Sequence, residues 1–422
     1  MEKFLQWLEK NLILPMARLS EERHFKAIRD SIGYISPLIM IGSIFLIIAY
    51  PPIPNLAEKM GLELVENILI PYRLTIGLIS LYVSYGIGYS LGTSYELDGI
   101  SCGILAMTSF IMTTIPLDMK EKGFVLPMDS LGGSSLFTAI LISTLTVELI
   151  KVLGSKDLII KMPKSIPDSV IKLYKNLRPI ASIILIIWIV RVVIGFDIQG
   201  FIINLFNPLV KAVNTFPGTL IIILLITLSW VVGIHGISVV GSIIRPIWLV
   251  LISENMVALA EGAKILPSIV SEPFFQWFVW IGGSGGTLGL VLLCLNSKSD
   301  YLKSLGKSSI MPGIHNINEP IIFGAPIVLN PLLGIPFVVS PLITGTISYF
   351  AMYFNLVARP AIIPPWTLPA PIGAYLATNG DWRAIVLVIV NIAIMTAIYY
   401  PFFKAYEKQL LQKEQGKDTV TE

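Results

Sequence analysis

The residue whose type and setting most clearly suggest chemistry is Glu319, in the segment NINEPIIFGAPIVLNP. Its neighbours are mostly apolar, and a carboxylate at membrane depth costs at least about 2.5–3.5 kcal/mol unless it is paired or hydrated. Pro320 follows directly, and proline is favoured at the first position of a helix, so Glu319 could also cap a short helix. The two roles are compatible, because the tip of a re-entrant segment can both begin a helix and face a cavity. We therefore predict a functional role for Glu319.

His235 lies in VVGIHGISVVG, between two apolar runs and flanked by Gly233 and Gly236. Glycines on both sides allow a ligand or a second backbone to approach closely. A lone histidine on an apolar face is more often a hydrogen-bonded core residue than a ligand, so His235 by itself does not indicate a site. Together with Glu319, however, it would form a buried donor–acceptor pair suited to sugar hydroxyl groups.

His315 stands four residues before Glu319, a spacing that could bring two metal ligands together on one helix. Pro312 and Pro320 exclude one regular helix through this segment. Further ligands of the right kind are also lacking, so we do not expect a metal site. Asn318 is the better candidate here, because its carboxamide can both donate to and accept from a hydroxyl.

Aromatic and glycine-rich segments supply the other candidates for sugar binding. Most membrane tryptophans belong to the interfacial belt, but Trp230 lies five residues before His235 and could stack on a sugar ring. Trp366, in IIPPWTLPAP, has a similar setting. The run GGSGG, which contains Gly283 and Ser284, predicts either a close helix crossing or a backbone that lines the site. It lacks the lysine of a phosphate-binding loop, so no nucleotide site is indicated.

Two further kinds of reactive group lie in apolar runs. Arg245, in GSIIRPIW, could pair with Glu254 or face the cavity, and the residues alone do not decide between these. Cys102 and Cys294 are too few and too isolated for a disulfide framework or a zinc site. Their apolar settings also disfavour a reactive thiolate, so both are predicted to be packing residues.

The elements that hold these candidates are those of a membrane protein. Hydrophobic residues make up 54% of the 422 residues and charged residues 14%, which is too little polar surface for a soluble protein. The length suffices for about ten spans of roughly 20 residues. Long apolar runs that predict such spans occur at 31–50, 70–92, 99–116, 133–153, 180–203, 217–234, 236–253, 274–296, 332–356 and 381–403.

Helix breakers divide the chain into two kinds of sequence. The first half has clean apolar runs, whereas 282–380 is dense in proline and glycine. Non-helical backbone at membrane depth is tolerated only where protein or a watery cavity surrounds it. We therefore predict re-entrant hairpins at 310–331 and 360–378 and place the substrate site in this half. The predicted organisation has four parts. Residues 1–178 form an N-terminal amphipathic helix, the scaffold and dimer-interface spans and a basic cytoplasmic loop. Residues 179–216 form a connecting span and an amphipathic linker, 217–404 a sugar-binding domain and 405–422 a cytoplasmic tail.

Basic residues indicate the orientation. They concentrate before residue 31, in the loop 151–178, near 298–307 and in the tail, and the positive-inside rule makes these segments cytoplasmic. Both termini are then cytoplasmic. No small-residue cleavage site follows the first apolar residues, so the N-terminal segment is predicted to be an uncleaved amphipathic helix on the membrane surface.

At GIHGISVVG, NINEPIIFGAP and PPWTLPAPIGAYLATNGDWRA the sequence resembles the membrane IIC component of bacterial phosphotransferase systems, specifically the lactose/cellobiose/diacetylchitobiose family. The resemblance covers nearly the whole chain, including LIIKMPKSIPDSV. It implies an all-α fold of about ten transmembrane helices with re-entrant hairpins, a homodimer formed through the N-terminal half, and a sugar site in the C-terminal half. It also implies that His235 and Glu319 bind the hydroxyl that becomes phosphorylated, usually the one at C6. WTLPAP and Arg245 depart from the pattern expected of the family, which leaves the sugar preference open.

The resemblance implies group translocation of a disaccharide such as cellobiose or diacetylchitobiose across the bacterial cytoplasmic membrane. The chain would be the membrane component of a phosphoenolpyruvate-dependent sugar phosphotransferase. Its phosphoryl donor would be a phosphocysteine on a separate IIB protein, supplied by IIA, HPr and enzyme I. Glu319 is the predicted general base, with His235 beside it, and neither a cofactor nor a nucleic acid partner is expected. A secondary transporter coupled to protons or sodium is the alternative, and the residues taken alone fit it equally well.

Overall fold

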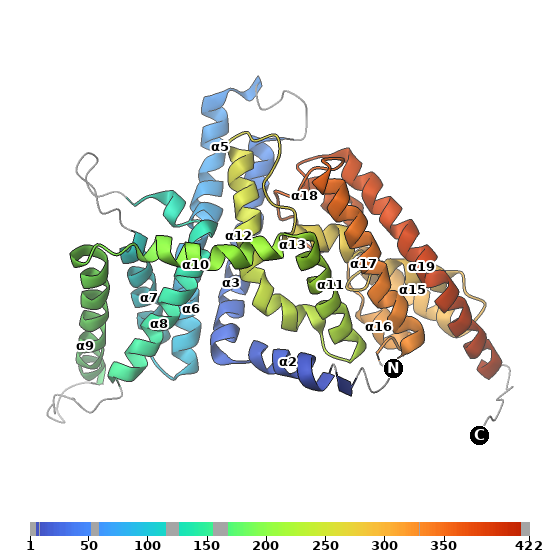
Figure 1. The fold of residues 1–422 in the computed structure, drawn as a ribbon, viewed down its shortest axis with the longest axis horizontal. Coiled ribbons are helices and arrows are strands. Elements are labelled where there is room, and N and C mark those ends of the chain that lie inside the picture. The colour runs from blue at the N-terminus through green and yellow to red at the C-terminus, as the bar shows by residue number, and fades with distance from the viewer. Residues whose placement is uncertain are drawn as a thin grey trace. The chain divides into compact units, whose positions relative to one another are not determined.

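The computed structural model describes two compact units, each assembled from segments that are not contiguous in the sequence (Figure 1). Unit 1 comprises Met1–Ser20, Ser43–Leu69 and Val210–Glu422, and unit 2 comprises Glu21–Gly42 and Ile70–Leu209. Every regular element among the described residues is helical, which confirms the predicted all-α fold. The residues described are 6–7, 9–51, 59–114, 126–154, 168–328 and 330–414.

Most of the predicted apolar runs form helices that suit a bilayer. Two shorter apolar helices are α7 (Gly99–Thr114) and α11 (Phe216–Val231), and a bent pair, Leu177–Val193 with Ile198–Val213, could form one further broken span. Among the described residues, six segments are long and apolar enough to cross a membrane: Arg23–Ala49, Leu62–Ser94, Gly133–Leu153, Gly236–Ala260, Leu332–Tyr353 and Trp382–Gln412.

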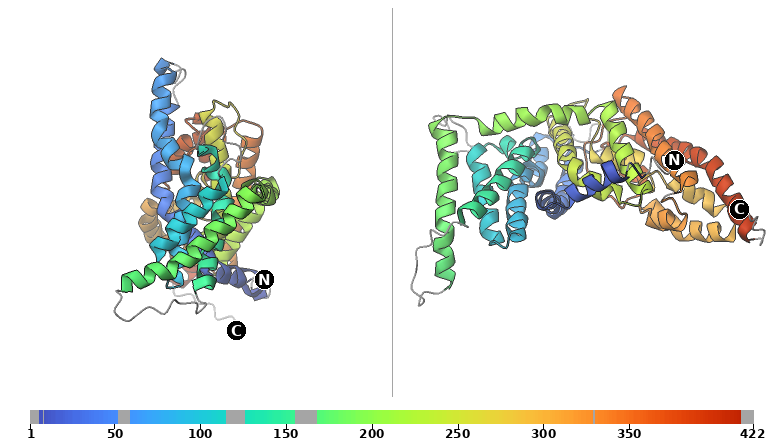
Figure 2. Two further views of the ribbon diagram at one scale, coloured as in Figure 1. Left: turned by 90° about the vertical axis from the view of Figure 1, so that its left-hand side faces the viewer. Right: turned by 60° about the horizontal axis from the view of Figure 1, so that its bottom comes forward.

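Two of the predicted runs are not single straight helices. The run 180–203 bends by 88° between α9 (Asp168–Trp188), extended by the π-helical η5 (Ile189–Val193), and α10 (Ile198–Val213) (Figure 2). The run 274–296 is interrupted by a glycine turn. It consists of α13 (Glu272–Phe274), the π-helical η6 (Phe275–Val279), the turn, and α14 (Leu288–Leu295). Hydropathy averages over such breaks, so the apolar pattern alone predicted continuous spans.

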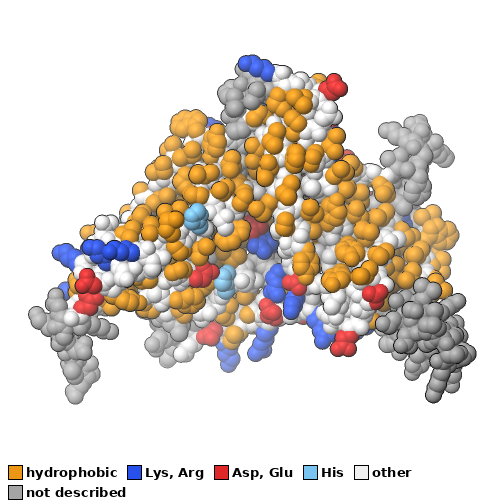
Figure 3. Space-filling model, turned by 180° about the vertical axis from the view of Figure 1, so that it is seen from behind, with side chains coloured by type: hydrophobic (Ala, Val, Ile, Leu, Met, Phe, Trp, Pro, Cys, Tyr) orange, Lys and Arg blue, Asp and Glu red, His pale blue; other side chains and the backbone are white. Residues whose placement is uncertain are grey.

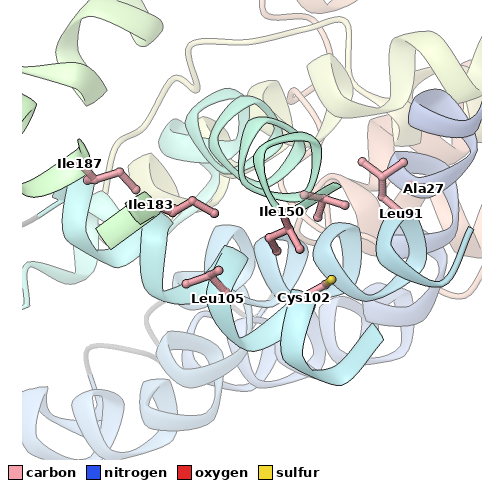
Figure 4. Packing of buried hydrophobic residues seen from close by; sticks show 8 residues of the cluster. Ala27, Leu91, Cys102, Leu105, Ile150, Ile183 and Ile187 are labelled. Atoms are coloured by element: carbon pink, nitrogen blue, oxygen red, sulfur yellow. The ribbon is translucent and has the colours of Figure 1, made fainter. Parts of the chain in front are cut away.

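Unit 2 is held together by close packing of small residues. Its helices α6 (Ile79–Ser94), α7 and α8 (Leu136–Gly154) contact one another, and α8 also contacts α9. A Cβ atom on Gly88 would lie 2.6 Å from the carbonyl oxygen of Cys102, so α6 and α7 can cross at this distance only because Gly88 has none. The buried cluster beside this crossing is drawn in Figure 4 and consists of Ala27, Leu91, Cys102, Leu105, Val147, Ile150, Ile183 and Ile187.

The remaining helices of unit 2 are short or continue into unit 1. The 3-10 turns η2 (Ile76–Leu78), η3 (Met128–Ser130) and η4 (Gly133–Ser135) lie near one another around the start of α6. Three helices begin in one unit and end in the other: α3 (Arg23–Ala49), α5 (Leu62–Thr75) and α10.

Unit 1 contains the segments that carry the candidate site. Helices α17 (Pro331–Tyr353) and α19 (Trp382–Glu414) lie side by side, α11 packs on α17, and α14 packs against both α15 (Asp300–Ile314) and α19 (Figure 1). Near the N-terminus, the π-helical η1 (Glu9–Ile13) leads into α2 (Leu14–Ser20), which contacts α12 (Gly236–Ala260). Proline and glycine keep the other two helices short, α16 (Glu319–Gly324) and α18 (Ala370–Ala377).

The surface is that of a protein surrounded by lipid. Hydrophobic side chains cover much of the face shown in Figure 3, and most of its charged side chains gather in the lower part of the view. Along α3, Ile41, Ile44 and Ile48 are each about half exposed, at helical spacing. A stripe of large apolar side chains that faces outwards is expected where a helix meets hydrocarbon and not water.

Candidate active site

His235 is positioned by the tight turn between α11 and α12, where it is the N-cap residue of α12. Its Nδ1 accepts a hydrogen bond from the backbone amide of Ser238, at 3.2 Å, and lies 3.0 Å from the hydroxyl of Ser238. The turn requires glycine next to the histidine, because a Cβ atom on Gly236 would lie only 2.1 Å from the carbonyl oxygen of Ile226. The flanking glycine that the sequence analysis singled out therefore allows one backbone to approach another.

The cap fixes which nitrogen of His235 can face a ligand. A backbone amide can only donate, so Nδ1 must carry a lone pair, and the neutral imidazole then holds its proton on Nε2. Nε2 lies 3.8 Å from Oε1 of Glu319. This distance is too long for a direct hydrogen bond but leaves room for one hydroxyl oxygen to bridge the two atoms. The site therefore presents an N–H donor beside a carboxylate acceptor.

Glu319 is the first residue of α16, and Pro320 follows it in the first turn, as expected. The N-cap position belongs to Asn318, so the hypothesis that Glu319 itself caps the helix is wrong. The side chains of His235 and Glu319 are 45% and 46% exposed, respectively. The expectation that this pair is buried is therefore also wrong: both groups face open space and are accessible to a ligand.

Trp230 supports the imidazole from within the protein. The two ring centroids of Trp230 and His235 are 4.3 Å apart, and the planes are tilted by 47°. Trp230 is only 4% exposed, and its indole nitrogen has no hydrogen-bond partner among the described residues. The structure thus places Trp230 against His235, where its ring is covered by protein, and stacking on a sugar ring stays a prediction.

The glycine run forms a turn directly beside the Asn-Glu-Pro segment. Asn318 is 4% exposed and donates from Nδ2 to the carbonyl oxygen of Ser284, at 2.8 Å. A Cβ atom on Gly283 would lie 2.5 Å from Cγ of Asn318, and Ser284 is itself buried. The amide nitrogen of Asn318 is therefore engaged with protein backbone, so this residue holds the turn in place as well as lying next to Glu319.

Asn316 is the main residue of this region that the sequence analysis did not select. Its Oδ1 accepts from the amide of Gly282 at 3.2 Å, and its Nδ2 donates to the carbonyl oxygens of Trp366 and Leu368 at 3.1 and 3.0 Å. The ring nitrogen Nδ1 of the adjacent His315 lies 2.6 Å from the carbonyl oxygen of Thr367. Asparagine is enriched among residues with left-handed backbone, and Asn316 has φ +61°, so its place after a helix was the available signal.

Arg245 forms an ion pair that neither of the two alternatives had anticipated. Its Nη2 and Nε donate to Oε1 of Glu272, at 2.9 and 3.1 Å, while Glu254 accepts from the hydroxyl of Ser268 instead. Glu272 is 27 residues from Arg245 in the sequence, beyond the reach of local reasoning. Among the described residues, no three His, Cys, Asp or Glu side chains come together as a metal site would require.

Comparison with known proteins identifies the family. Residues 29–341 match the family described as "Phosphotransferase system, EIIC". The chain is 36% identical to the cellobiose-specific EIIC component of Geobacillus stearothermophilus, over 100% of this chain and 98% of the relative. It is 37% identical to the lichenan permease IIC component of Bacillus subtilis (strain 168), over 100% and 97%. The crystal structure of the transporter ChbC, the IIC component of an N,N'-diacetylchitobiose-specific phosphotransferase system, superposes with a TM-score of 0.90 at 36% identity, covering 97% of this chain and 100% of that one. The resemblance seen in the motifs is thereby confirmed, and the chain belongs to the EIIC family of phosphotransferase-system membrane proteins.

Proposed function

We propose that this chain is a sugar permease that takes up a disaccharide such as cellobiose or diacetylchitobiose and presents it for phosphorylation by a separate IIB protein. The observation that carries the proposal is the pair His235 and Glu319, whose Nε2 and Oε1 atoms lie 3.8 Å apart and face open space. The names of the relatives support the class of sugar, since they include cellobiose-specific and diacetylchitobiose-specific components.

The geometry suits activation of one sugar hydroxyl. The hydroxyl would accept from Nε2–H of His235 and donate to the carboxylate of Glu319, which acts as general base. Its oxygen would then attack the phosphorus of the phosphocysteine on IIB: an O–P bond forms, the S–P bond breaks, and the proton passes to Glu319. Repulsion between the new phosphate and a carboxylate that has lost its proton again would favour release of the product.

The remaining candidates take supporting roles in this proposal. Trp366, which is 53% exposed, is available for stacking against a sugar ring, and Trp230 holds the imidazole. Asn318, Gly283 and Ser284 form the wall beside Glu319. All of these residues lie in unit 1, which supports the proposal that residues 217–404 bind the sugar. The scaffold and dimer interface over 1–178, the linker over 179–216 and the cytoplasmic tail over 405–422 complete the proposed organisation.

The lactose-specific relatives support the need for IIB. A relative that is 32% identical to this chain, from Staphylococcus haemolyticus, is named a lactose-specific EIICB component, and that name joins IIC to IIB. We infer that the phosphoryl donor of this system is carried by a second protein, which in turn receives phosphate through IIA, HPr and enzyme I. The proposed assembly is a homodimer with both termini in the cytoplasm.

Replacement of Glu319 tests the proposal. In membranes supplied with purified phospho-IIB, Glu319→Gln keeps the shape of the side chain but removes the base, and sugar phosphorylation should fall by roughly 10²–10⁴-fold. Glu261→Gln is the matched control, because Glu261 follows the last turn of α12, about 39 Å from His235 along the helix. Near-normal sugar phosphorylation by Glu319→Gln would exclude Glu319 as the general base. Proteoliposomes that accumulate unmodified sugar on an ion gradient would instead support an ion-coupled transporter.

A further inference from the structure

We propose that Asn316 is a positioning residue for sugar recognition, whose buried carboxamide sets the place of Trp366 relative to Glu319 and the glycine turn. The inference rests on the proposed function, because it assumes that the site at His235 and Glu319 binds the sugar. It extends that function by assigning a role to a residue whose side chain is buried in the protein.

The carboxamide of Asn316 joins three segments that are distant in the sequence. It accepts from Gly282, 34 residues away, and donates to Trp366 and Leu368, which are 50 and 52 residues away. Asn316 is only 9% exposed, so these bonds form largely out of contact with solvent, where a lost partner is costly. One side chain therefore holds the turn beside Asn318 and the loop of Trp366 together.

The asparagine side chain meets all the requirements at this position. The amide of Gly282 can only donate, and the two carbonyls can only accept, so the side chain must offer both an acceptor and a donor. Aspartate would place a carboxylate oxygen against two carbonyl oxygens, and alanine would offer neither group. The backbone of Asn316 has φ +61°, a conformation that asparagine and aspartate tolerate better than most residues.

The loop of Trp366 is held through its backbone by these bonds. Trp366 is 53% exposed, whereas the carbonyl oxygens of residues 366, 367 and 368 are all bonded to Asn316 or His315. The position of the exposed ring is therefore set through its backbone. Asn316 is also only three residues from Glu319. Its side chain therefore fixes the position of the Trp366 loop relative to the carboxylate that binds the hydroxyl.

The test compares Asn316→Asp and Asn316→Ala with Asn255→Ala in the purified full chain. Asn255 is a matched control: it is fully buried, donates to the carbonyl oxygens of Ser268 and Pro360 at 2.6 and 2.7 Å, and accepts from the amide of Ser268 at 2.8 Å. Asn316→Asp retains the acceptor for Gly282 and the tolerated backbone, so it remains informative if the alanine variant does not fold. The probes are cellobiose, diacetylchitobiose and lactose, of which the sugar bound most tightly by the wild type is used.

Both Asn316 variants should weaken equilibrium sugar binding and raise KM by about 10–100-fold, with kcat at saturating sugar within about threefold of the wild type. Asn255→Ala should lower the melting temperature about as much as Asn316→Ala does, but its KM should stay unchanged. Unchanged KM in Asn316→Asp would overturn the inference, as would an equal rise in Asn255→Ala. Binding is measured without IIB, so it is read separately from the Glu319→Gln phosphorylation assay; a wild type that binds none of the three sugars contradicts the proposed function itself.

Discussion

His235 uses its two ring nitrogens for different purposes. Nδ1 accepts from the amide of Ser238 at the start of α12, and Nε2 faces the carboxylate of Glu319. The fold therefore sets the tautomer of the imidazole, since the neutral ring that caps the helix must present its N–H towards Glu319. A substitution that keeps the helix cap but removes the Nε2–H should lower activity and leave stability nearly unchanged.

His235→Asn makes that separation. Asparagine is among the best N-cap residues, so the melting temperature should change little, corresponding to at most about 1 kcal/mol. Its side chain cannot extend a second nitrogen towards Glu319, so sugar phosphorylation should fall by at least tenfold or so. Ser238→Ala is the control, because it keeps the backbone amide bond and should alter KM less than about threefold. A fully active His235→Asn enzyme would show that Nε2 is not used.

The candidate site was only partly predictable from the sequence. Glu319 and His235 stand out because a polar group in an apolar run is costly unless it has a use or a partner. Their separation and exposure were not predictable, because both depend on how α11, α12 and α16 pack. Asn316 and the Arg245–Glu272 pair depend on contacts between distant segments, which leave no local pattern.

At the scale of elements, the place of His235 depends on how closely α11 approaches the start of α12. A Cβ atom on Gly236 would lie 2.1 Å from the backbone oxygen of Ile226, and backbone cannot swing aside as a side chain can. Gly236→Ala should therefore cost about 1–3 kcal/mol of stability and weaken sugar binding as His235 is displaced.

Gly241→Ala provides the control on the same helix. A Cβ atom there would meet its nearest neighbour, Cγ2 of Ile237, at an ordinary 3.5 Å. This variant should be neutral or gain up to about 1 kcal/mol from helix propensity. Thermal unfolding and equilibrium sugar binding measure both variants, and equal effects of the two would contradict the steric explanation.

The start of α19 is held by an acidic group whose ionisation couples stability to pH. The side chain of Asp381 is 8% exposed, and it accepts hydrogen bonds from the amide of Ala358 and from the guanidinium of Arg383. Burial acts to raise the pKa of Asp381, but the hydrogen bonds from Arg383 and Ala358 outweigh it and leave the pKa below its usual value. The stabilisation is therefore complete above the unfolded pKa of about 3.9 and is lost as pH falls through the folded pKa.

Asp381→Asn should reveal this dependence. At pH 7 the variant should melt below the wild type, because asparagine cannot replace the charge-assisted bonds to Arg383. The gap between the two melting temperatures should narrow as the pH is lowered towards about 3 and the wild-type carboxylate becomes protonated. A gap that stays constant over this range would exclude Asp381 as its source.

The all-helical fold was predictable from hydropathy, since most apolar runs became helices close to the predicted bounds. The interruption of 274–296 and the bend near 194–197 were not. Both depend on a few backbone dihedral angles, and an apolar pattern averaged over some twenty residues is insensitive to them.

At the scale of the whole molecule, each of the two units has its own network of hydrogen-bonded polar side chains. In unit 2, Glu148 accepts from the hydroxyl of Tyr95, and one of its oxygens lies 2.9 Å from Nε2 of His24. The residues of the proposed sugar site all lie in unit 1. Substitutions in this network of unit 2 should therefore lower stability without changing sugar affinity.

Glu148→Gln tests this division. The variant loses the charged acceptor shared by Tyr95 and His24, so its melting temperature should drop by a few degrees. The dissociation constant for sugar should stay within about twofold of the wild type, because no group of the site is altered. A large change in affinity, with the fold intact, would show that sugar binding involves unit 2 as well.

The glycine turn beside Glu319 restricts how proteins of this kind can change their sugar preference. Gly282, Gly283, Gly285 and Gly286 all have positive φ, and a methyl group on any of them would meet neighbouring atoms at less than 3 Å. Substitution is therefore disfavoured along this turn, where only Ser284 carries a side chain within 282–286. New specificities, whether selected in nature or sought in a library, are more accessible through the exposed loop around Trp366, where side chains can be exchanged without rebuilding the backbone.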